Sequence, residues 1–325
     1  MRNGRPRIVS LLPSATEIVC ALGLRDTLVG VSHECDYPAS VGSLPKVTRT
    51  LIPPELPSDE IDQLVRQQLA HTKALYSLNL ELLASLKPDL IVTQALCDVC
   101  AVAADEVMTA ACQLPGRPRV LNLEPMCLEE VFATLLMVGE AAGTPQQAAT
   151  VVASLRERVA RVVACVPAGP RPRVAFLEWL DPPFNGGHWT PELIRLAGGD
   201  DCFNGGGRAS RTLAWREIVA AQPDVLFMAL CGFGIERSLQ DVPALVSRAG
   251  WSDLPCVRAG QVWLADGNQY FSRPGPRLVE SLEVLAAVLH PACQAPTKVA
   301  GAPVRLDAVT LGTQRLQDST TWPTA

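Results

Sequence analysis

Short apolar runs alternate with stretches of helical periodicity along most of the chain. Each run is rich in Val, Ile and Leu and is bounded by Pro, Gly or Asp, a pattern typical of buried strands. We expect strands at residues 7–12, 28–32, 89–93, 120–123, 174–179, 225–229 and 262–265. Strands that alternate with helices predict an α/β fold with mostly parallel sheets.

The longest helical pattern lies in the middle of the chain. Residues 126–166 contain no strand-like run and break only at Gly143-Thr144-Pro145, where Pro145 suits the first turn of a helix. Its place between two strand-rich halves predicts a helix that connects two lobes, each a mostly parallel sheet flanked by helices. The expected division is 1–125 for the N-terminal lobe, 126–168 for the helical connector, 169–292 for the C-terminal lobe and 293–325 for a tail.

The two halves share a sequence element. Glu81 begins ELLASLKPDLIV and Glu217 begins EIVAAQPDVLF, and Ala-Leu-Cys follows a few residues later in each half. Both copies combine a short helix, a Pro-Asp pair and a strand, which predicts a duplicated lobe. Two such lobes imply a ligand cleft between them, because open α/β sheets bind ligands at the carboxyl ends of their strands.

Composition and charge exclude several classes of protein. The chain has 325 residues, of which 48% are apolar and 19% charged, so it is too apolar for a disordered chain. The net charge is −5 and there is no basic run, which argues against a nucleic-acid partner. No apolar stretch approaches the ~18 residues of a membrane span.

The start of the chain and its cysteines bear on location. Residues 8–12 form a short apolar run that meets Pro13 at once, unlike the apolar region of a secretory signal. The 11 cysteines are scattered, as in a reducing compartment where Cys acts as a small buried residue. We therefore expect a cytoplasmic location for the chain as encoded, or a periplasmic or cell-surface one if the start is truncated.

Four loops that follow predicted strands carry candidate binding chemistry: residues 13–15, 33–36, 181–191 and 267–277. In the first, free N–H groups at the start of a helix suit a polar or anionic ligand, although Ser14 and Glu17 also fit a capping box. In the third, Phe184 and Trp189 offer flat apolar faces beside paired glycines. In the fourth, Arg273 suits an amide or a phosphate, unless the loop is only an exposed helix start.

Two segments also allow metal or redox chemistry. His33 and Cys35 share a loop, and Cys97 and Cys100 form a C-x-x-C pair after another strand. Imidazole and thiolate are ligands of soft or borderline metals, and a C-x-x-C pair suits redox exchange. The spacing fits neither a zinc finger nor a thioredoxin, so packing and direct ligand contact remain open. No G-x-S-x-G, Walker A or G-x-G-x-x-G motif follows a strand, which predicts a protein that is not an enzyme.

The order of these motifs resembles the cobalamin-binding proteins of bacterial cobalamin ABC importers, which are helical-backbone (class III) periplasmic binding proteins. The resemblance covers roughly residues 7–291 and rests on RIVSLLPSATEIVCALGL, VGVSHECDYP, NLELLASLKPDLIV, FLEWLDPPFNGG with LAGGDDCF, and YFSRPGPRL. It implies two α/β lobes joined by one long helix, no enzymatic activity and a corrinoid ligand.

The resemblance also implies roles for single residues. Family members contact the ligand through the turn that opens the first helix, the aromatic of Pro-Pro-Phe and the arginine before the last helix; these match Ser14, Phe184 and Arg273. One glutamate in each lobe docks on arginines of the membrane permease, and these match Glu81 and Glu217.

Several positions depart from the family pattern. Glu34, Gln94 and Arg211 stand at or near positions where the best-known members carry aromatic residues, and Gln269 replaces an acidic residue. A segment of about residues 50–75 is absent from shorter members. We therefore expect a large cleft whose ligand can differ from theirs.

These observations together predict a monomeric, non-enzymatic protein that holds cobalamin or a related corrinoid in the interlobe cleft, for ABC-type uptake or intracellular handling. The expected ligand residues are Ser14, Ala15, His33, Glu34, Gln94, Phe184, Gly187, Trp189, Gln269 and Arg273. A further hypothesis brings the His33 imidazole to the axial position of the cobalt, oriented by Glu34 or Asp36. The alternatives are a haem or ferric-siderophore binder on the same scaffold, and a cytosolic metal or redox protein that uses Cys97 and Cys100.

Overall fold

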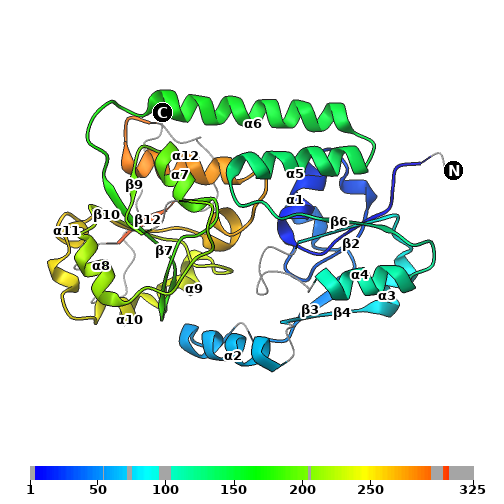
Figure 1. Cartoon of the computed structure of the whole chain (residues 1–325), viewed down its shortest axis with the longest axis horizontal. Helices are drawn as coiled ribbons and strands as arrows, with labels where there is room; N and C mark the ends of the chain where they lie inside the picture. Colours follow the sequence, from blue (N-terminus) through cyan, green and yellow to red (C-terminus); the bar gives the residue numbers. More distant parts are fainter. Residues whose placement is uncertain are drawn as a thin grey trace. The chain divides into compact units, whose positions relative to one another are not determined.

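We describe the protein from a computed structural model that places residues 4–53, 55–71, 75–94, 104–203, 206–293 and 303–306. The chain divides into two compact units. The first comprises Met1–Pro125 and Glu129–Ser154, and the second comprises Met126–Leu128 and Leu155–Ala325. Each unit combines parallel strands with helices, so the predicted α/β class is confirmed (Figure 1).

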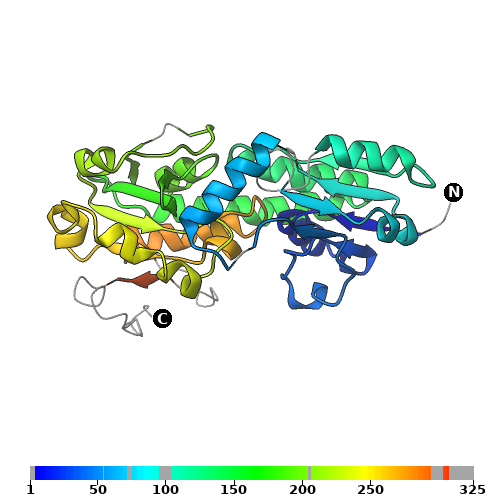
Figure 2. The same cartoon turned by 90° about the horizontal axis from the view of Figure 1, so that it is seen from below.

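The first unit is built on a sheet of four parallel strands in the order β2-β1-β5-β6. The strands are β1 (Ile8–Ser10), β2 (Leu28–Val31), β5 (Leu90–Thr93) and β6 (Arg119–Asn122). The helices are α1 (Pro13–Ala21), α3 (Leu80–Leu86), α4 (Ala104–Gln113) and α5 (Leu128–Ala141), with 3-10 turns at Arg25–Thr27 and Ala39–Val41. In Figure 2 these strands run from dark blue to teal through the middle of the unit.

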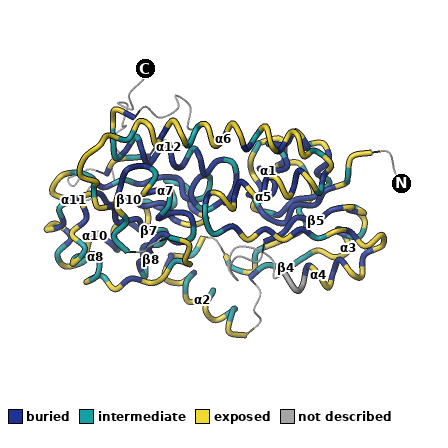
Figure 3. The backbone as a smooth tube through the Cα atoms, turned by 45° about the horizontal axis from the view of Figure 1, so that its top comes forward, coloured by how far each residue is buried: buried dark blue, intermediate teal, exposed yellow. Residues whose placement is uncertain are grey.

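Alternating side chains of these strands face helices on both sides of the sheet. Val9 of β1 and Ile91 of β5 pack with Leu83 of α3 and Val107 of α4. All four side chains are fully buried. Helices α1 and α5 cover the opposite face (Figure 1). Burial is deepest along the strands, whereas the outer surfaces of the helices are exposed (Figure 3).

A small antiparallel sheet interrupts the first unit between β2 and α3. Strand β3 (Thr48–Thr50) pairs with β4 (Tyr76–Leu78), and α2 (Ser58–His71) lies in the connection between them. Within α2 only Ser58 and Ile61 are buried. The segment predicted as an insertion, about residues 50–75, therefore contains a largely exposed helix that connects the two strands of this small sheet.

The second unit is built on a six-stranded sheet in the order β12-β11-β10-β7-β8, with β9 also beside β7. Its strands are β7 (Arg173–Leu180), β8 (Pro183–Asn185), β9 (Asp200–Asp201), β10 (Val225–Met228), β11 (Val262–Leu264) and β12 (Val304–Arg305). Strands β7, β9, β10 and β11 are parallel, and β8 and β12 are antiparallel additions. The rings of Phe176, Phe227 and Phe271 meet in the core, with centroids 5.3 to 5.5 Å apart.

Short helices follow the strands of the second unit. They are α7 (Thr190–Leu196), α8 (Trp215–Ala221), α9 (Ile235–Leu239), α10 (Val242–Val246), α11 (Pro255–Arg258) and α12 (Leu278–Leu289), with a π-helical turn at Gly267–Phe271 and a 3-10 turn at Trp251–Asp253. Helices α7 and α12 lie together on one side of the sheet (Figure 1). These helices follow loops at the strand ends, where the sequence placed the binding residues.

Helix α6 (Pro145–Cys165) runs from the first unit into the second and is the longest of the described helices. It begins at Pro145, as predicted. In the second unit Arg158 makes a bidentate ion pair with Glu283 of α12, with N–O distances of 2.9 and 2.6 Å. A disulfide joins Cys165 at the end of α6 to Cys293, with Cα atoms 5.6 Å apart. The second half of α6 is thus anchored to its unit by charge and by a covalent bond.

The repeated sequence element forms the same structure in both units. Helices α3 and α8 end in left-handed residues, Lys87 with φ 47° and Gln222 with φ 44°, each followed by Pro-Asp. The carboxylate of Asp89 accepts the Arg7 amide at 2.9 Å, and that of Asp224 accepts the Arg173 amide at 2.8 Å. In each unit the Asp therefore fixes the start of the strand next to it.

Two features of the chain differ from the sequence-based expectations. Helix α1 begins at Pro13, Leu12 occupies the N-cap position, and no side chain caps the helix. The predicted Ser14–Glu17 capping box is therefore wrong, because Ser14 lies one residue inside the helix and is buried. The stretch predicted as a tail contributes strand β12, which pairs with β11.

Candidate functional site

In the first unit the predicted ligand residues lie after β1, β2 and β5. Because these strands are parallel, the three loops share the carboxyl edge of one sheet. Ser14, Ala15 and Gln94 are nearly fully buried, with exposed fractions of 2%, 0% and 3%. His33 is half-buried and Glu34 is exposed. Of the predicted ligand residues at this edge, those in the loop after β2 are therefore the most exposed to solvent.

His33 is held by a small polar network. Its Nδ1 lies 2.8 Å from Thr48 Oγ1, and its backbone N–H donates to the same oxygen at 3.1 Å. The ring packs at 5.5 Å from the ring of Tyr76, whose hydroxyl donates to Glu34 Oε1 at 3.2 Å. Burial, with a smaller effect from Lys46, lowers the pKa of His33. The imidazole is therefore neutral at neutral pH, and Thr48 of β3 and Tyr76 of β4 position it.

In the second unit the loop after β7 divides into a buried and an open part. Trp189 is 5% exposed, and its Nε1–H donates to the Phe271 carbonyl at 2.9 Å. This indole is part of the core, so little of it is open to a ligand. Phe184 is half-buried on β8, directly across from Trp179 on β7. Trp179 also packs on Phe233, with centroids 5.1 Å apart.

Sequence reasoning missed two residues of this aromatic group. Trp179 closes the predicted strand 174–179, immediately before the candidate loop, and Phe233 follows the repeated Ala-Leu-Cys segment. Their positions at strand ends were the available signal. Antiparallel pairing of β8 with β7, which brings Phe184 beside Trp179, has no such signal in the sequence.

Gly187 lies where two backbone segments approach closely. A Cβ at this position would lie 2.2 Å from the Ser210 backbone nitrogen. The Gly187 amide donates to Glu178 Oε2 at 3.2 Å. Burial raises the pKa of Glu178, against hydrogen bonds from Ser210 and Gly187 that lower it. Glycine is therefore required at position 187 because any side chain there would clash with the backbone of the neighbouring segment.

The loop after β11 is a network of polar side chains. Asp266 accepts the Gln269 amide N–H at 2.8 Å and the Gln269 side-chain amide at 3.1 Å. Arg273 is 4% exposed and donates to Asn268 Oδ1 at 2.9 Å. Arg277 lies over the Tyr270 ring, 5.2 Å from its centroid. Gln269 is half-buried and thus more open than Arg273.

The two predicted docking glutamates occupy the first turns of short helices. Glu81 is exposed near the start of α3. Glu217 accepts from Arg211 at 2.8 Å and from the Ala214 amide at 2.8 Å. The Arg211 hydrogen bond is the larger cause of a lowered pKa at Glu217. Arg211 is therefore the ion-pair partner of a predicted docking residue.

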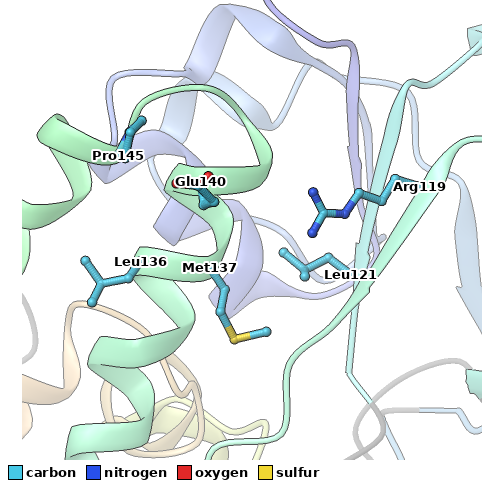
Figure 4. Close-up of a pocket in the computed structure, with 6 residues that line it drawn as sticks. All are labelled: Arg119, Leu121, Leu136, Met137, Glu140 and Pro145. Atoms are coloured by element: carbon cyan, nitrogen blue, oxygen red, sulfur yellow. The ribbon is translucent and has the colours of Figure 1, made fainter.

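A separate pocket lies in the first unit, between β6 and α5. Its volume is about 460 Å³, and its lining residues are Arg119, Leu121, Leu136, Met137, Glu140 and Pro145 (Figure 4). None of the ligand residues predicted from the sequence lines it. The pocket is thus distinct from the loops at the carboxyl edge of the sheet.

The described residues contain neither a cluster suited to a resident metal nor a helix suited to a membrane span. Among the described residues, no group of three or more His, Cys, Asp or Glu side chains is arranged to hold a metal ion. Cys97 and Cys100 lie outside the described residues. Of the helices in the described segments, none has the length and apolar character to cross a membrane.

Two α/β units with a long helix running from one into the other define a class of ligand-binding proteins, and sequence comparison assigns the family. The chain belongs to the periplasmic binding protein family, which it matches over residues 8–268. It is thus a binding protein of the ABC-importer type, and its relatives are substrate-binding proteins rather than enzymes.

Individual relatives cover most of the chain. A vitamin B12-binding protein of Vibrio cholerae is 24% identical over 286 residues, 87% of this chain and 88% of its own. An uncharacterized ABC transporter substrate-binding lipoprotein of Bacillus subtilis, YvrC, is 26% identical over 88% of this chain and 80% of its own.

Solved structures share the fold. The periplasmic vitamin B12-binding protein BtuF of Vibrio cholerae has a TM-score of 0.64 and 21% identity, covering 89% of this chain and 98% of its own. The periplasmic heme-binding protein RhuT of Roseiflexus sp. RS-1 has a TM-score of 0.67 and 26% identity, covering 90% of this chain and 100% of its own.

The predicted cytoplasmic location is wrong. The family is that of periplasmic binding proteins, and its relatives here are periplasmic proteins or a lipoprotein, which indicates an extracellular-facing location. The Cys165–Cys293 disulfide also contradicts the reducing compartment predicted from scattered cysteines. The error arose because scatter along the sequence does not reveal which cysteines meet in the fold.

Proposed function

We propose that this protein binds cobalamin or a related corrinoid and delivers it to an ABC permease. The observation that carries the proposal is family membership together with similarity to a vitamin B12-binding protein over 87% of the chain. The proposal assigns ligand contacts to loops at the carboxyl edges of both sheets. These include the half-buried Phe184 and Gln269 and the β2 loop with His33 and Glu34.

The chemistry of these loops suits a corrinoid. A corrin ring has broad apolar faces and a rim of amide groups. The half-buried rings of Trp179 and Phe184 match the faces, and polar side chains such as Gln269 match the amides. Each Å² of apolar surface buried contributes roughly 25 cal/mol before the cost of association.

Gel filtration with cyanocobalamin tests the proposal. The protein mixed with the vitamin at micromolar concentration should elute with a corrin absorbance. Phe184→Ala should weaken binding about tenfold or more, because it removes a large apolar contact. Val163→Ala, which trims an exposed residue on α6, is the matched control and should leave affinity unchanged. Absence of the vitamin from the protein peak would contradict the proposal.

Haem is the second candidate ligand. RhuT, a heme-binding protein, is 26% identical over 90% of this chain. Parallel titrations with hemin and cyanocobalamin, followed in the visible range, separate the two. Saturation by hemin at concentrations where cyanocobalamin does not bind would favour the haem alternative.

The proposal also assigns Glu81 and Glu217 to permease docking. Charge reversal at both should reduce corrinoid uptake in cells that carry the variant as their sole copy, and leave ligand affinity intact. Because Glu217 also accepts the Ala214 amide, Glu217→Gln tests the charge while keeping an acceptor. Glu157→Lys, at an exposed glutamate of α6, is the control. Loss of ligand binding in the docking variants would show that these residues were misassigned.

A further inference from the structure

We infer that His33 is an axial ligand of the cobalt in the bound corrinoid, with Nε2 as the donor atom and Thr48 as the positioning residue. The inference rests on the proposed function and adds a bond between the protein and the metal of its ligand. It also changes the orienting group expected from the sequence. The Thr48 hydroxyl, rather than a carboxylate of Glu34 or Asp36, holds the imidazole.

The hydrogen bonds around Thr48 select the tautomer of His33. Thr48 Oγ1 donates its one hydrogen to Ser32 Oγ at 3.1 Å and accepts the His33 backbone N–H at 3.1 Å. The 2.8 Å contact between Thr48 Oγ1 and His33 Nδ1 then requires Nδ1 to donate, because a hydroxyl has a single hydrogen. The free lone pair therefore lies on Nε2. A hydrogen-bonded Nδ1–H is the usual support for metal ligation through the other ring nitrogen.

The surroundings of the ring fix its position and leave it open to a ligand. The Tyr76 ring packs on the imidazole, and the Tyr76 hydroxyl engages the Glu34 carboxylate. The His33 side chain stays half-buried at the carboxyl edge of the sheet. No group of three or more metal-binding side chains occurs in the described parts of the chain. His33 thus suits a metal that arrives already held by a macrocycle and needs one further ligand.

The reaction is a ligand exchange without electron transfer. In aquacobalamin a water molecule occupies an axial position of Co(III). The Nε2 lone pair forms the Co–N bond, the Co–O bond breaks, and neutral water leaves. Cyanocobalamin is the matched ligand control, because imidazole does not displace its cyanide.

Visible spectra of the two corrinoids bound to the protein test the inference. Wild-type protein should shift the spectrum of aquacobalamin toward that of its imidazole adduct, and His33→Ala should abolish the shift while cyanocobalamin still co-elutes. Thr48→Val should lower the affinity for aquacobalamin relative to cyanocobalamin by about tenfold or more, and Thr48→Ser should restore it. His71→Ala, at an exposed histidine of α2, is the control and should keep the shift.

The outcomes separate this inference from the proposed function. If neither corrinoid co-elutes, the proposed function fails. If both bind to wild-type protein and the aquacobalamin spectrum is unchanged, the axial bond alone is overturned. A shift that survives His33→Ala and is lost in His188→Gln would also overturn it, because His188, half-buried in the second unit, would then be the ligand.

Discussion

At the scale of single residues, burial distinguishes a core aromatic from a more open one within the segment that follows β7. Trp189 lies in the core of the second unit with its Nε1–H bonded to Phe271 O, whereas Phe184 is half-buried beside Trp179. The two residues are five positions apart in sequence and both follow β7. A substitution at Trp189 should therefore act on stability, and one at Phe184 on binding.

We predict that Trp189→Phe lowers the free energy of unfolding by about 1–3 kcal/mol, because it leaves the buried Phe271 carbonyl without its donor. Affinity of the folded protein for its ligand should change little. Thermal unfolding and ligand titration measure the two effects. Trp215→Phe is the control: Trp215 makes the same kind of bond to Ala249 O at 2.7 Å but is more exposed, so water can replace the lost donor. Weakened binding with unchanged stability would restore Trp189 as a ligand residue.

The sequence identified the loops but not the direction of their side chains. The apolar runs predicted that Phe184, Trp189 and Gln269 lie in segments that directly follow strands. The turn of Trp189 into the core depends on a carbonyl 82 residues away, and no local pattern encodes it. Ser14 does not cap the helix for a local reason, since Pro13 begins the helix two residues earlier than a cap at Ser14 requires.

At the scale of elements, the Pro-Asp pairs make equivalent connections between a helix and the sheet in the two units. Each pair connects a short helix, which ends in a left-handed residue, to a central strand. The Asp carboxylate accepts the backbone amide at the start of the neighbouring strand, from Arg7 beside β1 and from Arg173 of β7. The geometry agrees to within 0.1 Å, 2.9 Å at Asp89 and 2.8 Å at Asp224.

We predict that Asp89→Ala and Asp224→Ala each lower the free energy of unfolding by about 1 kcal/mol, because each leaves a strand amide without its acceptor. Urea unfolding measures the change as a shift of the midpoint at constant slope. If the two units unfold in separate transitions, each substitution should shift only the midpoint of the unit that contains it. Asp253→Ala is the control, because its partner Arg258 forms an exposed surface pair that contributes little. A large effect at only one Asp would contradict the equivalence.

Elements with apolar runs were predictable, and elements without them were not. The seven expected strands correspond to β1, β2, β5, β6, β7, β10 and β11, because buried parallel strands need continuous apolar sequence. Strands β3, β4, β8, β9 and β12 have two or three residues each and lie outside these runs. Strand β8 forms a hairpin with the adjacent β7, whereas β3, β4, β9 and β12 pair with strands farther along the chain.

At the scale of the whole molecule, the two α/β units and the long helix followed from the alternation of strands and helices. Location did not follow, because it was inferred from the start of the chain and the scatter of cysteines. The disulfide between Cys165 and Cys293 spans 128 residues, so spacing alone gives no sign of it. In the fold the two cysteines meet because α6 and α12 pack together, as the Arg158–Glu283 pair also shows.

The Cys165–Cys293 disulfide closes a long loop within the second unit. Such a bond stabilises mainly by restricting the unfolded chain, typically by about 2–4 kcal/mol and more for longer loops. Cys165→Ser with Cys293→Ser should therefore lower the melting temperature by several degrees, and dithiothreitol should do the same to wild-type protein. Cys112→Ser, at an exposed free cysteine, is the control. Protein isolated from the cell envelope without reductant should yield a cross-linked peptide pair containing Cys165 and Cys293. Reaction of both thiols with an alkylating reagent in that material would contradict the bond, and with it the structural support for an extracellular-facing location.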